Sequence, residues 1–169
     1  MSRRKIHIIG GPGSGKSYIA KILSEQYSLP ILDLDDIFWN NRSDTYGVKA
    51  DADERDQALN AFLEQEGWIV EGVYYHWLAR SFKEADLIIA LTPSVLIRDW
   101  RILKRFLKRR LGVIPSKKKE TFKGLRELIT WNHRYDGNNL AQARKFVTDL
   151  GCETVDCKDV ETVMKFLEG

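Results

Sequence analysis

Apolar runs with the length of strands alternate with helical patterns along the chain. The candidate strands are Lys5–Ile9, Pro30–Leu34, Trp68–Glu71, Leu87–Leu91 and Thr154–Cys157. Several of these runs are apolar at nearly every position, which is typical of strands covered on both faces. The intervening segments are predicted to be helical over Lys16–Tyr27, Ala52–Glu66, Tyr75–Phe82, Ser94–Leu111, Thr121–Arg134, Asn139–Leu150 and Val160–Leu167. This alternation predicts an α/β fold with a doubly wound, five-stranded parallel sheet and helices on both faces.

Composition narrows the class of protein. The chain has 169 residues, of which 43% are hydrophobic and 30% charged, so we expect a single domain over residues 1–169. Cys152 and Cys157 are too few for a disulfide framework and lack the spacing of a CxxC pair. The apolar run Ile6–Ile9 is too short for a signal peptide or a membrane span. We therefore expect a cytoplasmic protein with no membrane partner.

Charge is distributed unevenly along the chain. The net charge is +3, but residues 33–66 are rich in acids and residues 98–123 are strongly basic. One acidic and one basic region suit a cleft that binds a polyanion together with a metal ion. Two solvated faces are the alternative interpretation.

One glycine-rich segment matches the pattern G-x-x-x-x-G-K-[ST] in full. It consists of Gly10, Gly11, Pro12, Gly13, Ser14, Gly15, Lys16 and Ser17. Glycines allow successive backbone N–H groups to form an anion nest at a helix N-terminus. Lys16 then supplies a charge to the β- and γ-phosphates, and the Ser17 hydroxyl is placed to ligate Mg²⁺. A turn that binds nothing would not need Lys16, so the segment predicts binding of a nucleoside triphosphate.

Acidic residues follow the second predicted strand. Alternation along a strand would place Asp33 and Asp35 on one face at the carboxyl edge, where ligands bind in such sheets. One carboxylate could hold a metal-bound water, and another could accept a proton from an attacking hydroxyl. The alternative is that Asp35 or Asp36 caps a helix. Trp39 could stack on a base or sugar ring, or simply pack in the core.

The third predicted strand ends in Glu71-Gly72. An acid at this point can hold Mg²⁺ through water, and Gly72 would let the backbone approach the transferred phosphoryl group. An ordinary strand end is the alternative. The fourth strand ends in Thr92-Pro93 without an acid, so Glu71 is the better metal candidate.

The segment Ser94–Leu111 predicts an amphipathic, arginine-rich helix. Its apolar stripe consists of Leu96, Trp100, Leu103, Leu107 and Leu111, and the opposite face carries Arg98, Arg101, Arg105 and Arg109. Arginine suits bidentate phosphate contact, and on a mobile segment these side chains would surround the charge that develops during phosphoryl transfer. A solvated basic face is the alternative, also for the following Lys117-Lys118-Lys119. Arg134 could likewise reach a phosphate of a substrate or lie on the surface.

Four segments together resemble one family. The Gly10–Ser17 loop, residues 32–39 (LDLDDIFW), residues 68–74 (WIVEGVY) and the basic segment 98–110 are similar to the adenylate-kinase-like P-loop proteins named DNA topology modulation proteins. The resemblance implies ATP and Mg²⁺ at Lys16 and Ser17, an acceptor-binding insertion at about residues 36–66 and a lid at about residues 98–120. It implies that Asp33 and Asp35 face the acceptor and that the lid groups are Arg98, Arg101 and Arg105.

The chain departs from nucleoside monophosphate kinases at one place. Those kinases usually have Asp-Gly-Phe-Pro-Arg after the third strand, whereas this chain has Glu71-Gly72-Val73-Tyr74-Tyr75. The arginine that would hold an acceptor phosphate is missing from that place. The sequence therefore does not identify the molecule that accepts the phosphoryl group.

Two functions from different classes follow. The favoured one is a small-molecule kinase, a monomer or weak dimer, that transfers the γ-phosphoryl of Mg-ATP to a nucleotide, a nucleoside or another small acceptor. The alternative is a nucleotide-gated regulator whose basic helix binds nucleic acid with steep salt dependence. A simple ATPase is a weaker option, because no second carboxylate beside Glu71 is apparent for polarising water.

Overall fold

The computed structural model describes residues 4–40, 48–115 and 121–168. Parts of the expected insertion and lid, including Asp44 and Lys117-Lys118-Lys119, lie outside these residues. Among the described helices, none combines the length and apolar character needed to cross a membrane.

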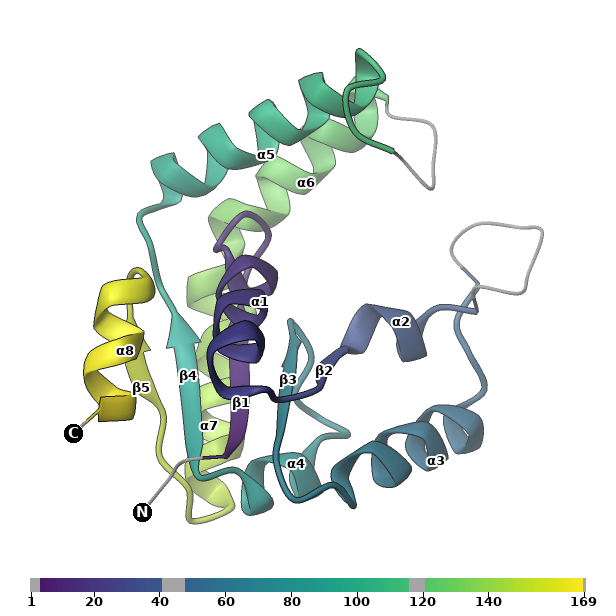
Figure 1. The fold of residues 1–169 in the computed structure, drawn as a ribbon. Helices are drawn as coiled ribbons and strands as arrows, with labels where there is room; N and C mark the ends of the chain where they lie inside the picture. The colour runs from purple at the N-terminus through teal and green to yellow at the C-terminus, as the bar shows by residue number, and fades with distance from the viewer. Residues whose placement is uncertain (1–3, 41–47, 116–120, 169) are drawn as a thin grey trace.

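In the described part of the chain, five parallel strands form one sheet in the order β2-β3-β1-β4-β5 (Figure 1). The strands are β1 (Lys5–Gly10), β2 (Ile31–Asp33), β3 (Trp68–Gly72), β4 (Leu87–Leu91) and β5 (Val155–Cys157). The doubly wound, five-stranded sheet is therefore confirmed. In its register Glu71 of β3 lies between Ile8 of β1 and Asp33 of β2, so the two acids are neighbours at the carboxyl edge.

The helices agree closely with the sequence pattern, with three differences. They are α1 (Lys16–Tyr27), α2 (Leu34–Phe38), α3 (Ala52–Leu63), α4 (Ala79–Glu84), α5 (Val95–Arg110), α6 (Phe122–Tyr135), α7 (Ala141–Asp149) and α8 (Val160–Glu168). The short α2 was not predicted, and α4 begins at Ala79 rather than Tyr75. A π-helical turn, η1 (Asp136–Leu140), joins α6 directly to α7 where a break was expected.

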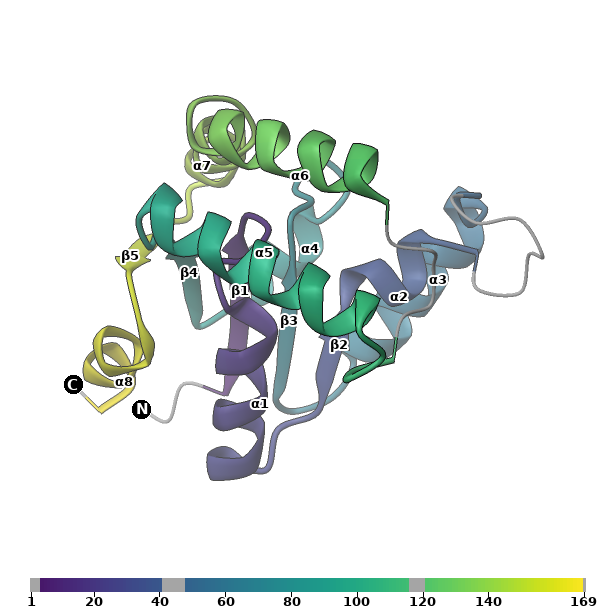
Figure 2. The ribbon, with the colours of Figure 1, turned by 90° about the horizontal axis from the view of Figure 1, so that it is seen from above.

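Alternation along the strands gives the sheet two apolar faces. Ile6 and Ile8 of β1 pack with Ile19 and Leu23 of α1 and with α8, whereas Trp68 and Val70 of β3 pack on the other face with α3, α4 and α7. The view from above shows α1 and α8 on one side of the sheet and α4 and α7 on the other (Figure 2). The sheet is thus covered on both faces, as its continuous apolar strands predict.

Helix α5 is rotated relative to the usual arrangement for an amphipathic helix. An apolar stripe normally faces the core, yet Leu96, Trp100, Leu107 and Leu111 are exposed. The buried positions are Arg98, Ile102 and Phe106, and the helix packs along α6. The predicted apolar stripe therefore faces outward, whereas Arg98 from the opposite face is packed inward and pairs with a carboxylate described below.

The rotation of α5 predicts which substitutions destabilise the protein. Phe106 is 3% exposed, so Phe106→Ala should lower the free energy of unfolding by about 3 kcal/mol or more through loss of burial and creation of a cavity. Leu111 is 76% exposed, so Leu111→Ala should change it by less than about 0.5 kcal/mol. Urea denaturation followed by circular dichroism measures both. Equal losses would contradict the orientation of α5 described above.

Candidate active site

The glycine-rich loop lies between the carboxyl end of β1 and the start of α1. Gly13 and Gly15 have φ angles of 72° and 97°, in the left-handed region that favours glycine. At Gly10 a Cβ atom would lie 2.5 Å from the Ser14 Oγ atom, so the neighbouring side chains leave little room for a larger residue there. Ser14 N–H donates to the Gly11 carbonyl at 3.2 Å, which closes the turn. This loop at a helix N-terminus has the features of an anion nest.

Lys16 and Ser17, the first residues of α1, converge on Glu71. The Ser17 hydroxyl donates to Glu71 Oε1 at 2.5 Å, and Lys16 Nζ lies 3.9 Å from Glu71 Oε2. Glu71 is 1% exposed, and burial raises its pKa to about 7 even though Lys16 acts in the opposite direction. The described residues offer Glu71 Oε2 no hydrogen bond. Two predicted site residues, Lys16 and Ser17, are thus brought together around a third, the buried carboxylate of Glu71.

These groups fit a magnesium ion. Mg²⁺ binds oxygen donors, usually one or two carboxylates together with waters and substrate phosphates. Glu71 supplies a buried carboxylate with one oxygen to which the described residues donate no hydrogen bond, and Ser17 supplies a hydroxyl beside it. The donor set therefore matches the metal predicted for Ser17 and Glu71.

Asp33 is placed differently from the prediction. The chain leaves the strand at Asp33, whose side chain accepts the Asp35 N–H at 2.9 Å and caps α2. The expectation that Asp33 and Asp35 alternate along a strand is wrong, and so is the alternative that Asp35 or Asp36 is the cap, because the strand ends early. Burial raises the pKa of Asp33, with the backbone N–H of Asp35 acting against it. Asp33 still lies beside Glu71, while Asp35 and Asp36 are exposed on α2.

Aromatic side chains from α2 and the segment after β3 form a wall near these acids. Phe38 stacks on Tyr74 with ring centroids 4.2 Å apart, and Trp77 lies 6.5 Å from Phe38. The Tyr74 hydroxyl donates to Asp35 Oδ1 at 2.7 Å, and the Arg55 guanidinium covers Trp77 at 4.2 Å. We call Phe38, Tyr74 and Trp77 the aromatic wall. Sequence reasoning missed it, although both contributing segments follow strand ends that meet at one edge of the sheet.

Trp39 and Gly72 lie at the border of this wall. Trp39 is half-buried and meets Phe38 edge-on, with centroids 4.9 Å apart. Gly72 is buried, and a Cβ there would lie 2.8 Å from Leu34 Cδ1. Packing against α2 therefore accounts for glycine at position 72 without a ligand.

The arginines of α5 differ in their surroundings. Arg98 is fully buried and its two terminal nitrogens donate to the two oxygens of Asp136, at 2.9 and 2.6 Å. Arg101 Nη1 donates to the carbonyls of Gly13 at 3.3 Å and Ser14 at 2.9 Å. Arg98 and Arg101 therefore both lie against the phosphate loop, and Arg101 and Arg105 are both exposed.

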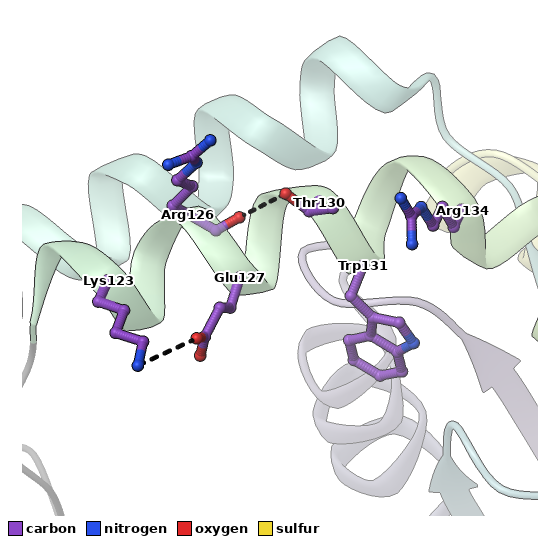
Figure 3. Close-up of a pocket in the computed structure, with 6 residues that line it drawn as sticks. All are labelled: Lys123, Arg126, Glu127, Thr130, Trp131 and Arg134. Carbon is purple, nitrogen blue, oxygen red and sulfur yellow. Dashed lines mark hydrogen bonds and ion pairs between the residues drawn. The ribbon is translucent and has the colours of Figure 1, made fainter.

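A pocket of about 440 Å³ lies on α6. It is lined by Lys123, Arg126, Glu127, Thr130, Trp131 and Arg134. Lys123, Glu127 and Trp131 point to one side of the helix and Arg126 to the other (Figure 3). Arg134, predicted to reach a substrate, is exposed and directly precedes Tyr135, whose ring lies beside Gly11 of the phosphate loop. The pocket lining thus comes from α6 and not from the Lys16–Glu71 cluster.

Comparison with known proteins assigns the chain to a family. Residues 6–113, more than half of the chain, match the family described as "AAA domain". The chain belongs to this family. The matched AAA-domain segment contains the phosphate loop, Glu71 and all of α5, so the site described above lies largely within it.

Two curated relatives carry the name of a kinase. The protein named "Putative adenylate kinase" from Sulfurisphaera tokodaii is 25% identical over 180 residues, covering 96% of this chain and 90% of the relative. The adenylate kinase of Clostridium kluyveri is 44% identical over 50 residues, which cover 30% of this chain and 23% of that enzyme. These relatives support a nucleotide-binding, kinase-like P-loop protein.

The fold has a solved counterpart. Shikimate kinase from Acinetobacter baumannii, in complex with shikimate, superimposes with a TM-score of 0.56 at 13% identity, covering 99% of this chain and 94% of that one. At this identity the likeness shows the fold alone. The P-loop kinase-like α/β fold is therefore confirmed, whereas the resemblance to DNA topology modulation proteins stays a prediction.

Proposed function

We propose that this protein is a kinase that transfers the γ-phosphoryl group of Mg-ATP to a small-molecule acceptor. The observation that carries the proposal is the meeting of Lys16, Ser17 and the buried Glu71 at the phosphate loop. The names of the relatives, which include adenylate kinases, support a phosphotransferase that acts on a small acceptor.

The proposed roles follow from position and charge. The loop N–H groups and Lys16 hold the phosphates, and Ser17 and Glu71 hold Mg²⁺, with Glu71 acting through water. When bound, Mg²⁺ neutralises charge on the phosphate oxygens. Asp33 lies beside Glu71, and its raised pKa suits a group that accepts the proton of an acceptor hydroxyl.

The acceptor is proposed to bind between the aromatic wall and α6. The aromatic wall offers ring faces for stacking. Asp35 and Asp36 lie on α2, which also carries Phe38 of the wall, and Trp39 directly follows this helix. Arg134 and Trp131 line the pocket on α6. In this proposal the single domain closes residues 36–66 and the basic segment 98–120 around both substrates, which excludes water and limits hydrolysis of ATP.

The second candidate, a nucleotide-gated nucleic-acid-binding regulator of DNA topology, is favoured by one observation. Lys104, Arg105 and Lys108 are exposed along α5. That function predicts steeply salt-dependent DNA or RNA binding, lost when Lys104, Arg105, Lys108 and Arg109 are changed to Glu. The buried Lys16–Glu71 arrangement supports the kinase more directly, because phosphoryl transfer would use it.

The proposed acceptor chemistry is tested with a panel of nucleoside monophosphates, nucleosides and small hydroxy acids. We expect ADP formation from Mg-ATP that depends on one class of acceptor. Asp33→Asn should lower turnover about a hundredfold while ATP affinity stays near that of the wild type, because an amide cannot take the proton. Asparagine also caps helices well, so α2 should persist.

Asp149→Asn is the matched control, because Asp149 is exposed on α7 and pairs with Lys145. Full activity of Asp33→Asn would show that Asp33 is not the proton acceptor. Tight Mg-ATP binding without transfer to any acceptor would instead favour the nucleic-acid-binding function.

A further inference from the structure

The ion pair between Arg98 and Asp136 joins two distant parts of the chain at the phosphate loop. Arg98 is fully buried, whereas Asp136 is partly exposed at the start of the π-helical turn η1. Both Arg98 Nη atoms are bound, at 2.9 and 2.6 Å, to the two oxygens of that one carboxylate. A bidentate pair fixes the plane of the guanidinium as well as its position.

Arg98 is in turn packed against two glycines of the loop. A Cβ at Gly13 would lie 2.6 Å from the Arg98 carbonyl oxygen, and a Cβ at Gly11 would lie 3.0 Å from Arg98 Nη1. Tyr135, the residue before Asp136, lies equally close to Gly11, with its Cδ1 atom 2.8 Å from the Cβ position. A shift of the guanidinium would therefore be passed to the backbone at Gly11, whereas Gly13 packs against the Arg98 main chain.

From these contacts we infer that Asp136 is a positioning residue for the phosphate loop. The inference rests on the proposed function, in which the loop N–H groups hold the phosphates of Mg-ATP. Asp136 would act through Arg98, from which it accepts two hydrogen bonds, and Arg98 packs behind Gly11 and Gly13. The π-helical turn that begins at Asp136 agrees with this role, because such turns frequently occur at functional sites.

Arg98 differs in this respect from the other arginines of the basic segment that is proposed to close, so the moving part of that segment begins after Arg98. The terminal nitrogens of Arg98 are committed to Asp136, and breaking the pair would leave a buried, uncompensated charge. Arg98 is thus expected to stay in place while nucleotide binds, and its contribution should appear in affinity for Mg-ATP rather than in affinity for the acceptor.

Asp136→Asn tests this role, with Mg-ATP affinity measured by isothermal titration calorimetry. We expect affinity to fall about tenfold, the lower end of the range found when a partner behind a ligand-contacting group is removed. Asp156→Asn is the matched control, since Asp156 forms another Arg–Asp ion pair, with Arg144, on the exposed surface. The control should bind as the wild type does.

Asp136→Glu distinguishes positioning from simple charge compensation and guards against loss of folding. It keeps the charge beside Arg98 but displaces the guanidinium, so the thermal unfolding temperature should stay near that of the wild type while Mg-ATP affinity still falls several-fold. Wild-type affinity in Asp136→Glu would overturn the inference, as would wild-type affinity in a folded Asp136→Asn. A wild-type protein that binds no Mg-ATP would overturn the proposed function and this inference with it.

Discussion

Lys16→Met is expected to lower Mg-ATP-dependent phosphoryl transfer about a thousandfold, the upper range for removing one group that stabilises transferred charge. Lys16 is the first residue of α1, and its Nζ atom lies 3.9 Å from Glu71 at the phosphate loop. Methionine keeps most of the length of the lysine stem and removes the charge. Because that charge stabilises the phosphoryl oxygens most strongly as they transfer, turnover should fall more than ATP affinity.

The control for this variant lies on the same helix. Lys21→Met removes a lysine that is 73% exposed and forms an ion pair with the exposed Glu25. Coupled detection of ADP, with the acceptor found in the panel, measures both variants. Retention of transfer by a folded Lys16→Met protein would show that the loop does not hold the transferred phosphate.

Features set by local sequence could be predicted closely. The helix Lys16–Tyr27 and the strand Leu87–Leu91 have the predicted bounds. Their boundaries depend on the glycine-rich loop and on an unbroken apolar run, both of which are visible in neighbouring residues. The phosphate loop and Glu71 could be located for the same reason, because the loop directly follows one predicted strand and Glu71 ends another.

Features set by tertiary contacts could not be predicted. The buried position of Arg98 on α5 is matched by Asp136, and these two residues are 38 positions apart in the sequence. The aromatic wall depends on α2, a short helix that begins where Asp33 caps it. Periodicity is informative about one helix at a time, so it revealed neither the partner of Arg98 nor the meeting of Phe38 with Tyr74.

Glu71→Gln should make the protein more stable and less active at the same time. Burial raises the Glu71 pKa from 4.5 to about 7 in the folded protein. The folded state therefore binds this proton more tightly than the unfolded state. The contribution of the protonated Glu71 to the free energy of unfolding is fully present below pH 4.5. It is lost as the pH rises to about 7, and the loss amounts to about 3 kcal/mol.

Glutamine removes this titration, so the unfolding free energy of Glu71→Gln should not show that loss. At pH 8 the variant should be more stable than the wild type, since its amide oxygen can still accept the Ser17 hydroxyl. Urea denaturation between pH 4.5 and 8 measures the difference. Glu25→Gln is the control, because Glu25 is exposed on α1 and should leave the pH dependence of the wild type in place.

Activity should change in the opposite direction. An amide lacks the charge that holds Mg²⁺, so phosphoryl transfer should fall about tenfold to a hundredfold. In the wild type, Mg-ATP should stabilise the protein more at pH 8 than at pH 5.5, because Glu71 must lose its proton before it can hold the cation. Higher stability with undiminished transfer would show that Glu71 is a buried acid without a role in metal binding. Lower stability at pH 8 would show instead that its charge is compensated by Lys16.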